Sequence, residues 1–198
     1  MTAFKLYAVC GKPVLHSKSP DIYNMLFEKN GIDSRYIRVR PESASEALSI
    51  YDSLGLSGMN VTAPFKEDFF SLLSNKNEDV KLTEAVNTVS GNEKSVYNTD
   101  IYGVESTLRM KSAVSGMKAV VLGAGGAAKA AVCALKNIGA DITLINRTEE
   151  KAELIAEKYS VKHAPFSELK NEIESCSILV STLPASASAF AGNCIHSG

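Results

Sequence analysis

A glycine-rich segment in the second half of the sequence constrains the fold of this chain more than any other feature. The apolar residues 120–122 lead directly into residues 123–128, Gly-Ala-Gly-Gly-Ala-Ala, and an alanine-rich segment follows. A buried strand, a G-x-G-x-x-A turn and a helix in this order are typical of the start of a dinucleotide-binding α/β fold. A tight strand-to-helix turn without a ligand is the alternative, and the flanking strand and helix favour binding.

Each position of this turn has a physical role in holding a dinucleotide. Gly123 makes the turn, Gly125 lets the pyrophosphate approach the backbone, and Ala128 permits close packing of the helix. The phosphates are expected at the N-terminus of the helix, where free N–H groups and the helix dipole favour an anion. The residues expected to bind the cofactor here are Gly123, Ala124, Gly125, Gly126 and Ala127.

The end of the next strand indicates which dinucleotide binds. An NAD site has Asp or Glu about 20 residues after the turn, where the carboxylate accepts a hydrogen bond from the ribose 2′-hydroxyl. This chain has Asn146, Arg147 and Thr148 there. The guanidinium of Arg147 can pair with a 2′-phosphate and stack on adenine, so NADP is the predicted cofactor. The alternative is that Arg147 is a solvated loop residue, and Thr148 is expected to cap the next helix in either case.

Strands and helices alternate along the whole chain, which predicts an α/β fold. In the first half we expect a mostly parallel sheet, with strands at residues 4–9, 35–39 and 58–61 and helices at 20–30, 43–54 and 66–73. Two short strands at 84–90 and 94–98, joined in a hairpin by Gly91-Asn92, and a helix at 101–111 follow. The second half has expected strands at 118–122, 142–146 and 177–180, a helix from the glycine turn to Ile138 and another at 149–159. We place the domain boundary in or just after the helix near 101–113, which gives domains at 1–105 and 106–198.

Composition excludes several classes of function. A formal net charge of −1 over 198 residues makes nucleic-acid binding unfavourable, and no segment has the roughly 20 apolar residues that a membrane helix needs. The four cysteines form no CxxC pair and the three histidines are scattered, so neither a disulfide framework nor a metal site is expected. A folded cytoplasmic protein, monomeric or homodimeric, is the expectation.

Two charged residues of the first half are candidate catalytic groups. Lys66 follows Pro64 in the first turn of an expected helix, where the helix dipole disfavours a cation. The dipole and partial desolvation both favour the neutral amine that proton transfer needs. A lysine whose ammonium simply reaches water is the alternative. Asp100 has an equally open alternative role as N-cap of the helix that starts near Ile101.

Four motifs in the first half resemble those of shikimate dehydrogenases in order and approximate spacing. They are His16-Ser17-Lys18-Ser19-Pro20, Asn60-Val61-Thr62-Ala63-Pro64-Phe65-Lys66, Ala85-Val86-Asn87-Thr88, and Asn98-Thr99-Asp100 with Gly103. The glycine turn and the Asn-Arg-Thr triplet continue the resemblance over nearly the whole chain. The resemblance implies an N-terminal α/β substrate-binding and catalytic domain and a Rossmann-type NADP-binding domain.

The resemblance also implies an activity and a role for each polar residue. The activity is the NADP-dependent, reversible reduction of 3-dehydroshikimate to shikimate, with Lys66 and Asp100 handling the proton. Ser17 and Ser19 are implied to bind the substrate carboxylate, and the alternative for Ser19 is that it only caps the helix at 20–30. The ring hydroxyls are implied to contact Asn60, Thr62, Asn87 and Asp100.

The chain departs from the family pattern near its end. A six-stranded dinucleotide fold needs roughly two more strand–helix units than the sequence shows, so we expect the second domain to be incomplete. Residues 181–184, Ser-Thr-Leu-Pro, are expected to start the nicotinamide-side loop, although the family more often has asparagine at Ser181. A quinate/shikimate dehydrogenase that also uses NAD, and an NADP-binding relative or fragment without turnover, are the alternative functions.

Overall fold

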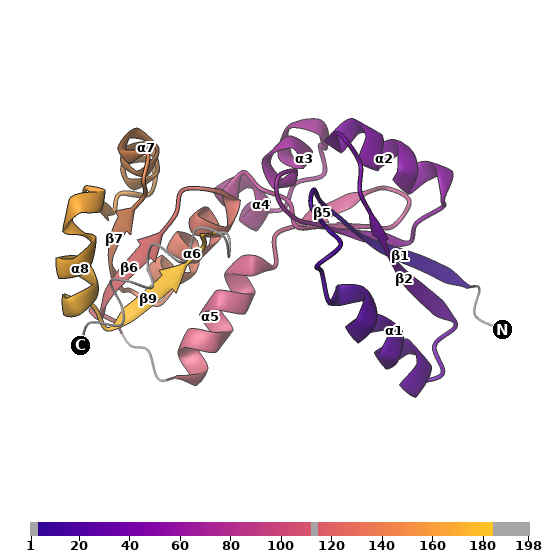
Figure 1. Cartoon of the computed structure of the whole chain (residues 1–198), viewed down its shortest axis with the longest axis horizontal. Helices are drawn as coiled ribbons and strands as arrows, with labels where there is room; N and C mark the ends of the chain where they lie inside the picture. Colours follow the sequence, from indigo (N-terminus) through magenta and orange to yellow (C-terminus); the bar gives the residue numbers. More distant parts are fainter. Residues whose placement is uncertain (1–3, 112–114, 184–198) are drawn as a thin grey trace. The chain divides into compact units, whose positions relative to one another are not determined.

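The computed structural model describes residues 4–111 and 115–183 of the chain. The chain divides into two compact units, Met1–Thr99 and Asp100–Gly198, and each contains one β-sheet (Figure 1). This division falls just before the helix that contains the predicted domain boundary at 105/106. Pro184, the last residue of the segment expected to start the nicotinamide-side loop, lies outside the described residues.

The sheet of the first unit is mixed. Its strands are β1 (Lys5–Cys10), β2 (Ser34–Val39), β3 (Gly58–Val61), β4 (Thr88–Ser90) and β5 (Ser95–Tyr97), in the spatial order β2-β1-β3-β4-β5. β1 is parallel to β2 and β3, whereas β4 is antiparallel to both of its neighbours. The β2-β1-β3 part is parallel, as expected for this half, and the expected hairpin joins the same sheet as β4 and β5. The whole sheet is therefore mixed, because a short hairpin can only be antiparallel.

Helices cover the two faces of this sheet unequally. The helices are α1 (Ser19–Lys29), α2 (Ala44–Ser53), α3 (Lys66–Leu72) and α4 (Glu78–Thr83). Figure 1 shows α1 on one face and α2 and α3 on the other. Strand alternation separates the two faces, since Met59 and Val61 are buried in the core with α2 and α3, while Asn60 between them lies on the α1 face.

The structure corrects two local predictions in this unit. Ser19 is the first residue of α1 rather than its N-cap; Lys18 holds the cap position and makes no side-chain cap hydrogen bond. Residues 84–87, expected to start a strand, instead follow α4, which the sequence analysis missed. The signal for α4 was Asn77, whose side chain accepts a hydrogen bond from the N–H of Val80 at 3.0 Å as an N-cap.

Within the described residues the sheet of the second unit is parallel throughout, as in the dinucleotide-binding fold that the glycine turn predicts. It consists of β6 (Lys118–Leu122), β7 (Asp141–Ile145), β8 (Lys162–His163) and β9 (Ile178–Ser181), in the order β8-β7-β6-β9. The helices are α5 (Asp100–Met110), α6 (Gly126–Asn137), α7 (Glu149–Tyr159) and α8 (Leu169–Ser175), preceded by the 3₁₀ turn η1 (Phe166–Glu168). The short elements β8, η1 and α8 were not predicted.

Small side chains let the helices of this unit approach the sheet closely. Ala128, Ala131 and Ala134 of α6 are fully buried in one core with residues of α5, α7 and the strands. Leu169 of α8 belongs to a separate cluster with Val120 on the other face, and Figure 1 shows α8 across the sheet from α6. None of the helices within the described residues is long and apolar enough to cross a membrane.

Candidate active site

The predicted substrate residues of the first unit lie at one edge of its sheet, the edge formed by the carboxyl ends of β1 and β3. β1 and β3 are parallel and end together, with Cys10 beside Val61. β4 is antiparallel to β3, so it starts at the edge where β3 ends, and the segment after β5 returns to that edge. The segments that meet there contain Ser17, Ser19, Asn60, Thr62, Lys66, Asn87 and Thr99.

The approach of two loops at this edge requires a glycine. Gly11 follows β1, and a Cβ atom at this position would clash with the side chain of Thr62, which follows β3. The N–H of Thr62 donates to the carbonyl of Cys10 at 2.9 Å, which holds the two loops together. Thr62 is thereby fixed beside the loop that leads to the serines.

The two serines lie together at the start of α1. The hydroxyl oxygens of Ser17 and Ser19 are 3.3 Å apart, and the backbone N–H of Ser19 donates to the Ser17 hydroxyl at 3.3 Å. Arg38 of β2 holds this turn, because its Nε and Nη2 atoms donate to the carbonyl of Ser17 at 3.1 and 2.6 Å. No local sequence pattern indicates this role of Arg38, since 21 residues separate it from Ser17. A turn with two hydroxyl groups and a neighbouring guanidinium suits a carboxylate ligand.

The two asparagines belong to one hydrogen-bonded network. The Asn60 amide nitrogen lies 3.2 Å from the hydroxyl of Thr88 and 3.4 Å from the carbonyl of Asn87. The side-chain oxygen of Asn87 accepts from the N–H of Thr99 at 3.0 Å. On the other side, the hydroxyl of Tyr36 lies 2.6 Å from the Asn60 side-chain oxygen. We call these five residues the asparagine network. Sequence reasoning missed Tyr36 in it, because nothing in its local pattern marks it.

Lys66 and Asp100 each start a helix. Lys66 is the first residue of α3, as predicted, and its side chain is half-buried. Its carbonyl accepts from the N–H of Val86 at 2.8 Å, which ties the start of α3 to the segment before Asn87. Asp100 is the first residue of α5 and is also half-buried. Lys66 belongs to the first unit and Asp100 to the second.

A cavity of about 400 Å³ lies on the α1 face of the first sheet. Asn60, Thr88 and Thr99 of the asparagine network line one part of it, and the aromatic rings of Tyr23 and Phe27 line another. The cavity therefore gives a small polar molecule access to the asparagine network.

In the second unit the strand order changes direction at the glycine turn. The chain passes from β6 to β7 on one side and later returns to place β9 on the other side of β6. Ligands of open α/β sheets bind at the carboxyl ends of the strands at such a switch point. Leu122 ends β6 and pairs with Ile145 and Ser181, so the glycine turn and the segments after β7 and β9 share this edge.

The glycine turn fits the backbone of a dinucleotide. Gly123 has a φ of +115°, which disfavours other residues, and a Cβ atom there would clash with the Thr182 hydroxyl. Thr182 is fixed, because its hydroxyl and its N–H donate to the carbonyl of Leu122 at 2.8 and 2.9 Å. A Cβ at Gly125, the N-cap of α6, would meet nothing within 4 Å. Open space beside the free N–H groups of a 12-residue helix suits a phosphate group.

The segment after β7 places Arg147 in solvent at the same edge. The Asn146 amide donates to the carbonyl of Thr148 at 2.9 Å, which closes the turn. Arg147 is exposed, as a group that meets a cofactor phosphate must be before binding. Thr148 is the N-cap of α7, as predicted, but its side chain makes no cap hydrogen bond.

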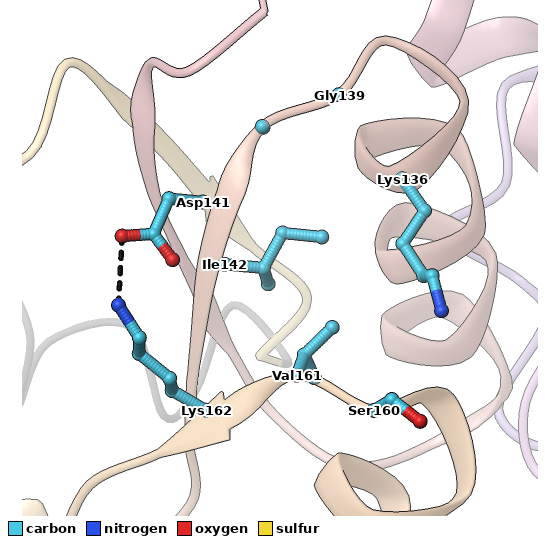
Figure 2. Close-up of a pocket in the computed structure, with 8 residues that line it drawn as sticks. Lys136, Gly139, Asp141, Ile142, Ser160, Val161 and Lys162 are labelled. Carbon is cyan, nitrogen blue, oxygen red and sulfur yellow. Dashed lines mark hydrogen bonds and ion pairs between the residues drawn. The ribbon is translucent and has the colours of Figure 1, made fainter.

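A cavity in the second unit lies at the opposite edge of the sheet, where β7 and β8 begin, and not at the glycine turn. It has a volume of about 480 Å³, and its lining includes Lys136 of α6, Asp141, which starts β7, and Lys162, which starts β8 (Figure 2). Asp141 and Lys162 form an ion pair of 2.8 Å, and the ammonium of Lys136 donates to the carbonyl of Tyr159. The charged groups of this cavity thus already have partners within the protein.

The fold defines the class of protein: a two-unit α/β protein whose second unit has the parallel sheet and the glycine turn of an NAD(P)-binding domain. Comparison with known families is more specific. The model of the shikimate dehydrogenase substrate binding domain matches residues 9–89, and the model of shikimate / quinate 5-dehydrogenase matches residues 105–194. The chain belongs to the shikimate dehydrogenase family.

Individual relatives support this assignment. The NADP(+) shikimate dehydrogenase of Pyrococcus abyssi (strain GE5 / Orsay) is 39% identical over 178 residues, which are 89% of this chain and 67% of the relative. The crystal structure of shikimate dehydrogenase from Aquifex aeolicus superposes with a TM-score of 0.83 at 37% identity, covering 91% of this chain and 69% of that one. The shikimate 5-dehydrogenase of Thermus thermophilus, in complex with NADP(H) and shikimate, gives 0.78 at 29% identity, with coverage of 90% and 68%. The chain thus spans about two thirds of the length of these relatives.

Proposed function

We propose that this protein catalyses the reversible, NADP-dependent reduction of 3-dehydroshikimate to shikimate. The observation that carries the proposal is the meeting of the predicted serines, asparagines, threonine and lysine at one edge of the first sheet. Family membership alone supports an oxidoreductase. This set of polar groups supports a substrate with one carboxylate and several hydroxyl groups.

Different polar residues are proposed to bind different groups of the substrate. The paired hydroxyls of Ser17 and Ser19, with Arg38 behind them, suit the carboxylate. Asn60, Thr62 and Asn87 are polar groups at the same edge and suit the ring hydroxyls, because amides and hydroxyls can both donate and accept. The substrate is thereby oriented before reaction, which lowers the entropic part of the barrier.

Lys66 and Asp100 are the proposed catalytic residues. In the direction of reduction, the Lys66 ammonium donates a proton to the C3 carbonyl oxygen, which becomes a hydroxyl group. In the direction of oxidation, the Lys66 amine takes a proton from that hydroxyl group. Asp100 matches the family motif and is the candidate for balancing the charge of the ammonium. NADPH, when bound, supplies the hydride for the C3 carbon.

NADP is the proposed cofactor in preference to NAD. The glycine turn and the N-terminus of α6 suit the pyrophosphate that both cofactors share. Arg147 distinguishes them, since it can pair with the 2′-phosphate that only NADP has, and no carboxylate stands at residues 146–148 to bind a free 2′-hydroxyl.

The test is a set of oxidation assays with purified protein. Four combinations, shikimate or quinate with NADP or NAD, are compared by the rate at which the reduced cofactor forms. The expected result is the highest kcat/KM for shikimate with NADP. Turnover of quinate with NAD at an equal or higher kcat/KM would replace the proposal by the quinate alternative. Absence of turnover, with NADP binding intact by calorimetry, would favour a binding role without catalysis.

A further inference from the structure

The donor and the acceptor of each hydrogen bond that links Asn87, Thr88, Asn60 and Tyr36 follow from one group that can only donate. The backbone N–H of Thr99 can only donate, so the side-chain atom of Asn87 that it meets at 3.0 Å is the oxygen. The hydroxyl of Thr88 lies 2.9 Å from this same oxygen. A carboxamide oxygen has no proton to give, so Thr88 must donate its single hydroxyl proton there.

The same reasoning continues to Asn60 and Tyr36. Because the proton of Thr88 is already donated to Asn87, the Thr88 oxygen can only accept from the Asn60 side chain at 3.2 Å. The Asn60 nitrogen therefore faces Thr88, and its oxygen faces the Tyr36 hydroxyl at 2.6 Å. Tyr36 must then be the donor. The hydroxyl protons of Thr88 and Tyr36 and the orientation of the Asn60 amide are thus assigned from the Thr99 N–H outward, and Tyr36 is the far end of the network.

Contacts of its backbone and its ring hold Tyr36 in place, so that its hydroxyl has a fixed position beside the Asn60 oxygen. Its backbone N–H and C=O both bond to the side chain of Asn24 of α1, at 2.8 and 2.9 Å. Its ring stacks on Tyr23 with centroids 4.7 Å apart and planes 10° from parallel. Only 4% of the residue is exposed. Burial, with smaller contributions from Tyr23 and Cys10, raises the pKa of the Tyr36 hydroxyl well above its usual value, so the donated proton is retained.

We propose that Tyr36 is a positioning residue for the substrate, whose hydroxyl reaches across β1 from β2 and fixes the orientation of the Asn60 amide on β3. This inference rests on the proposed function, in which Asn60 and Asn87 bind the ring hydroxyls. Without the Tyr36 hydroxyl, the Asn60 oxygen loses a buried donor, and the two orientations of its amide become closer in free energy. The substrate then has to select one of them, which weakens binding.

The experiment compares Tyr36→Phe with Tyr51→Phe. Tyr51 is the matched control, because it is also buried, 2% exposed, and its hydroxyl also donates one hydrogen bond, to the carbonyl of Gly91 at 2.9 Å. It packs in the core on the opposite face of the same sheet. Each variant loses one buried hydroxyl, so the melting temperatures should fall by similar amounts.

Two measurements separate positioning from stability. In ligand-free protein, the side-chain amide signals of Asn60, assigned by comparison with Asn60→Ala, are followed by NMR. We expect Tyr36→Phe to broaden or shift them and Tyr51→Phe to leave them unchanged. In titrations with shikimate, we expect Tyr36→Phe to raise Kd about five- to tenfold and Tyr51→Phe to stay within about twofold of wild type.

The network supplies a second pair of variants. Thr88→Ser keeps the hydroxyl that links the two asparagines and should retain the wild-type amide signals, whereas Thr88→Val removes it and should reproduce the effect of Tyr36→Phe. Unchanged Asn60 signals and an unchanged Kd in Tyr36→Phe would overturn the inference. If the wild-type protein does not bind shikimate, the proposed function fails, and the amide signals of ligand-free protein still decide whether Tyr36 orients Asn60.

Discussion

In the first unit the candidate ligand-binding groups are side chains, whereas in the second unit most are backbone N–H groups. Asn60 and Asn87 are oriented by hydrogen bonds to residues on neighbouring strands. The turn at Gly123 depends instead on backbone conformation and on the absence of a Cβ atom. Substitutions in the first unit should therefore act on the substrate and on the chemistry. Those in the second should act on cofactor affinity or on the stability of the turn.

The largest effect should come from the proposed catalytic pair. We expect Lys66→Ala and Asp100→Asn to lower kcat by about 10²–10⁴-fold, because a placed proton-transfer group contributes this much. Shikimate binding should change much less, since several other contacts hold the substrate. Steady-state kinetics with calorimetric titrations provide the measurement.

Lys81→Ala is the control for Lys66→Ala. Lys81 is an exposed lysine of α4 in the same unit, paired with Glu78 at 2.7 Å, and its removal should leave kcat unchanged. A near-normal kcat in Lys66→Ala would refute the mechanism. Loss of NADP affinity in that variant would contradict the division of roles between the units.

Arg147→Ala tests the proposed contact between the Arg147 guanidinium and the cofactor 2′-phosphate. Loss of a charge-assisted pair with the 2′-phosphate should raise the Kd for NADP about 10- to 100-fold and leave the Kd for NAD within about twofold. Arg109→Ala is the control, because Arg109 pairs with Glu105 on the surface of α5. Equal losses of affinity for NADP and NAD in fluorescence titrations would mean that Arg147 does not bind the 2′-phosphate.

Gly123→Ala tests the backbone requirement directly. The φ of +115° and the clash with Thr182 should lower the free energy of unfolding by about 1–2 kcal/mol, measured by denaturant titration. Gly103→Ala is the opposite case, since Gly103 lies inside α5 with open space around it. Alanine there should raise the free energy of unfolding by about 0.5–1 kcal/mol. If both variants shifted stability in the same direction, the turn would not need its glycine.

Ser17→Ala should have the smallest effect of the four. A carboxylate remote from C3 is held similarly in the ground and transition states, so we expect KM for shikimate to rise about five- to tenfold with little change in kcat. Ser49→Ala, which removes an exposed hydroxyl bonded to the carbonyl of Ser45 in α2, is the control. A fall in kcat at constant KM would place Ser17 in the chemistry instead.

Much of the second unit could be predicted from local sequence. The turn at residues 123–128 needs specific residues at fixed spacing, and the helices and strands beside it have clear apolar periodicity, so β6, α6, β7 and α7 were predicted within a residue or two. The short elements β8 and α8 were missed, because two to seven residues are too few to show a period.

In the first unit the sequence alone indicated the polar residues through their motifs, but not how they are oriented. The direction of β4 and β5, which makes the sheet mixed, brings Asn87 and Thr99 to the edge where β1 and β3 end. Tyr36 and Asn60 are 24 residues apart with no pattern that links them. They meet because the strand order β2-β1-β3 places both on the same face with only β1 between them, and strand order is decided by packing of the whole unit rather than by any local segment.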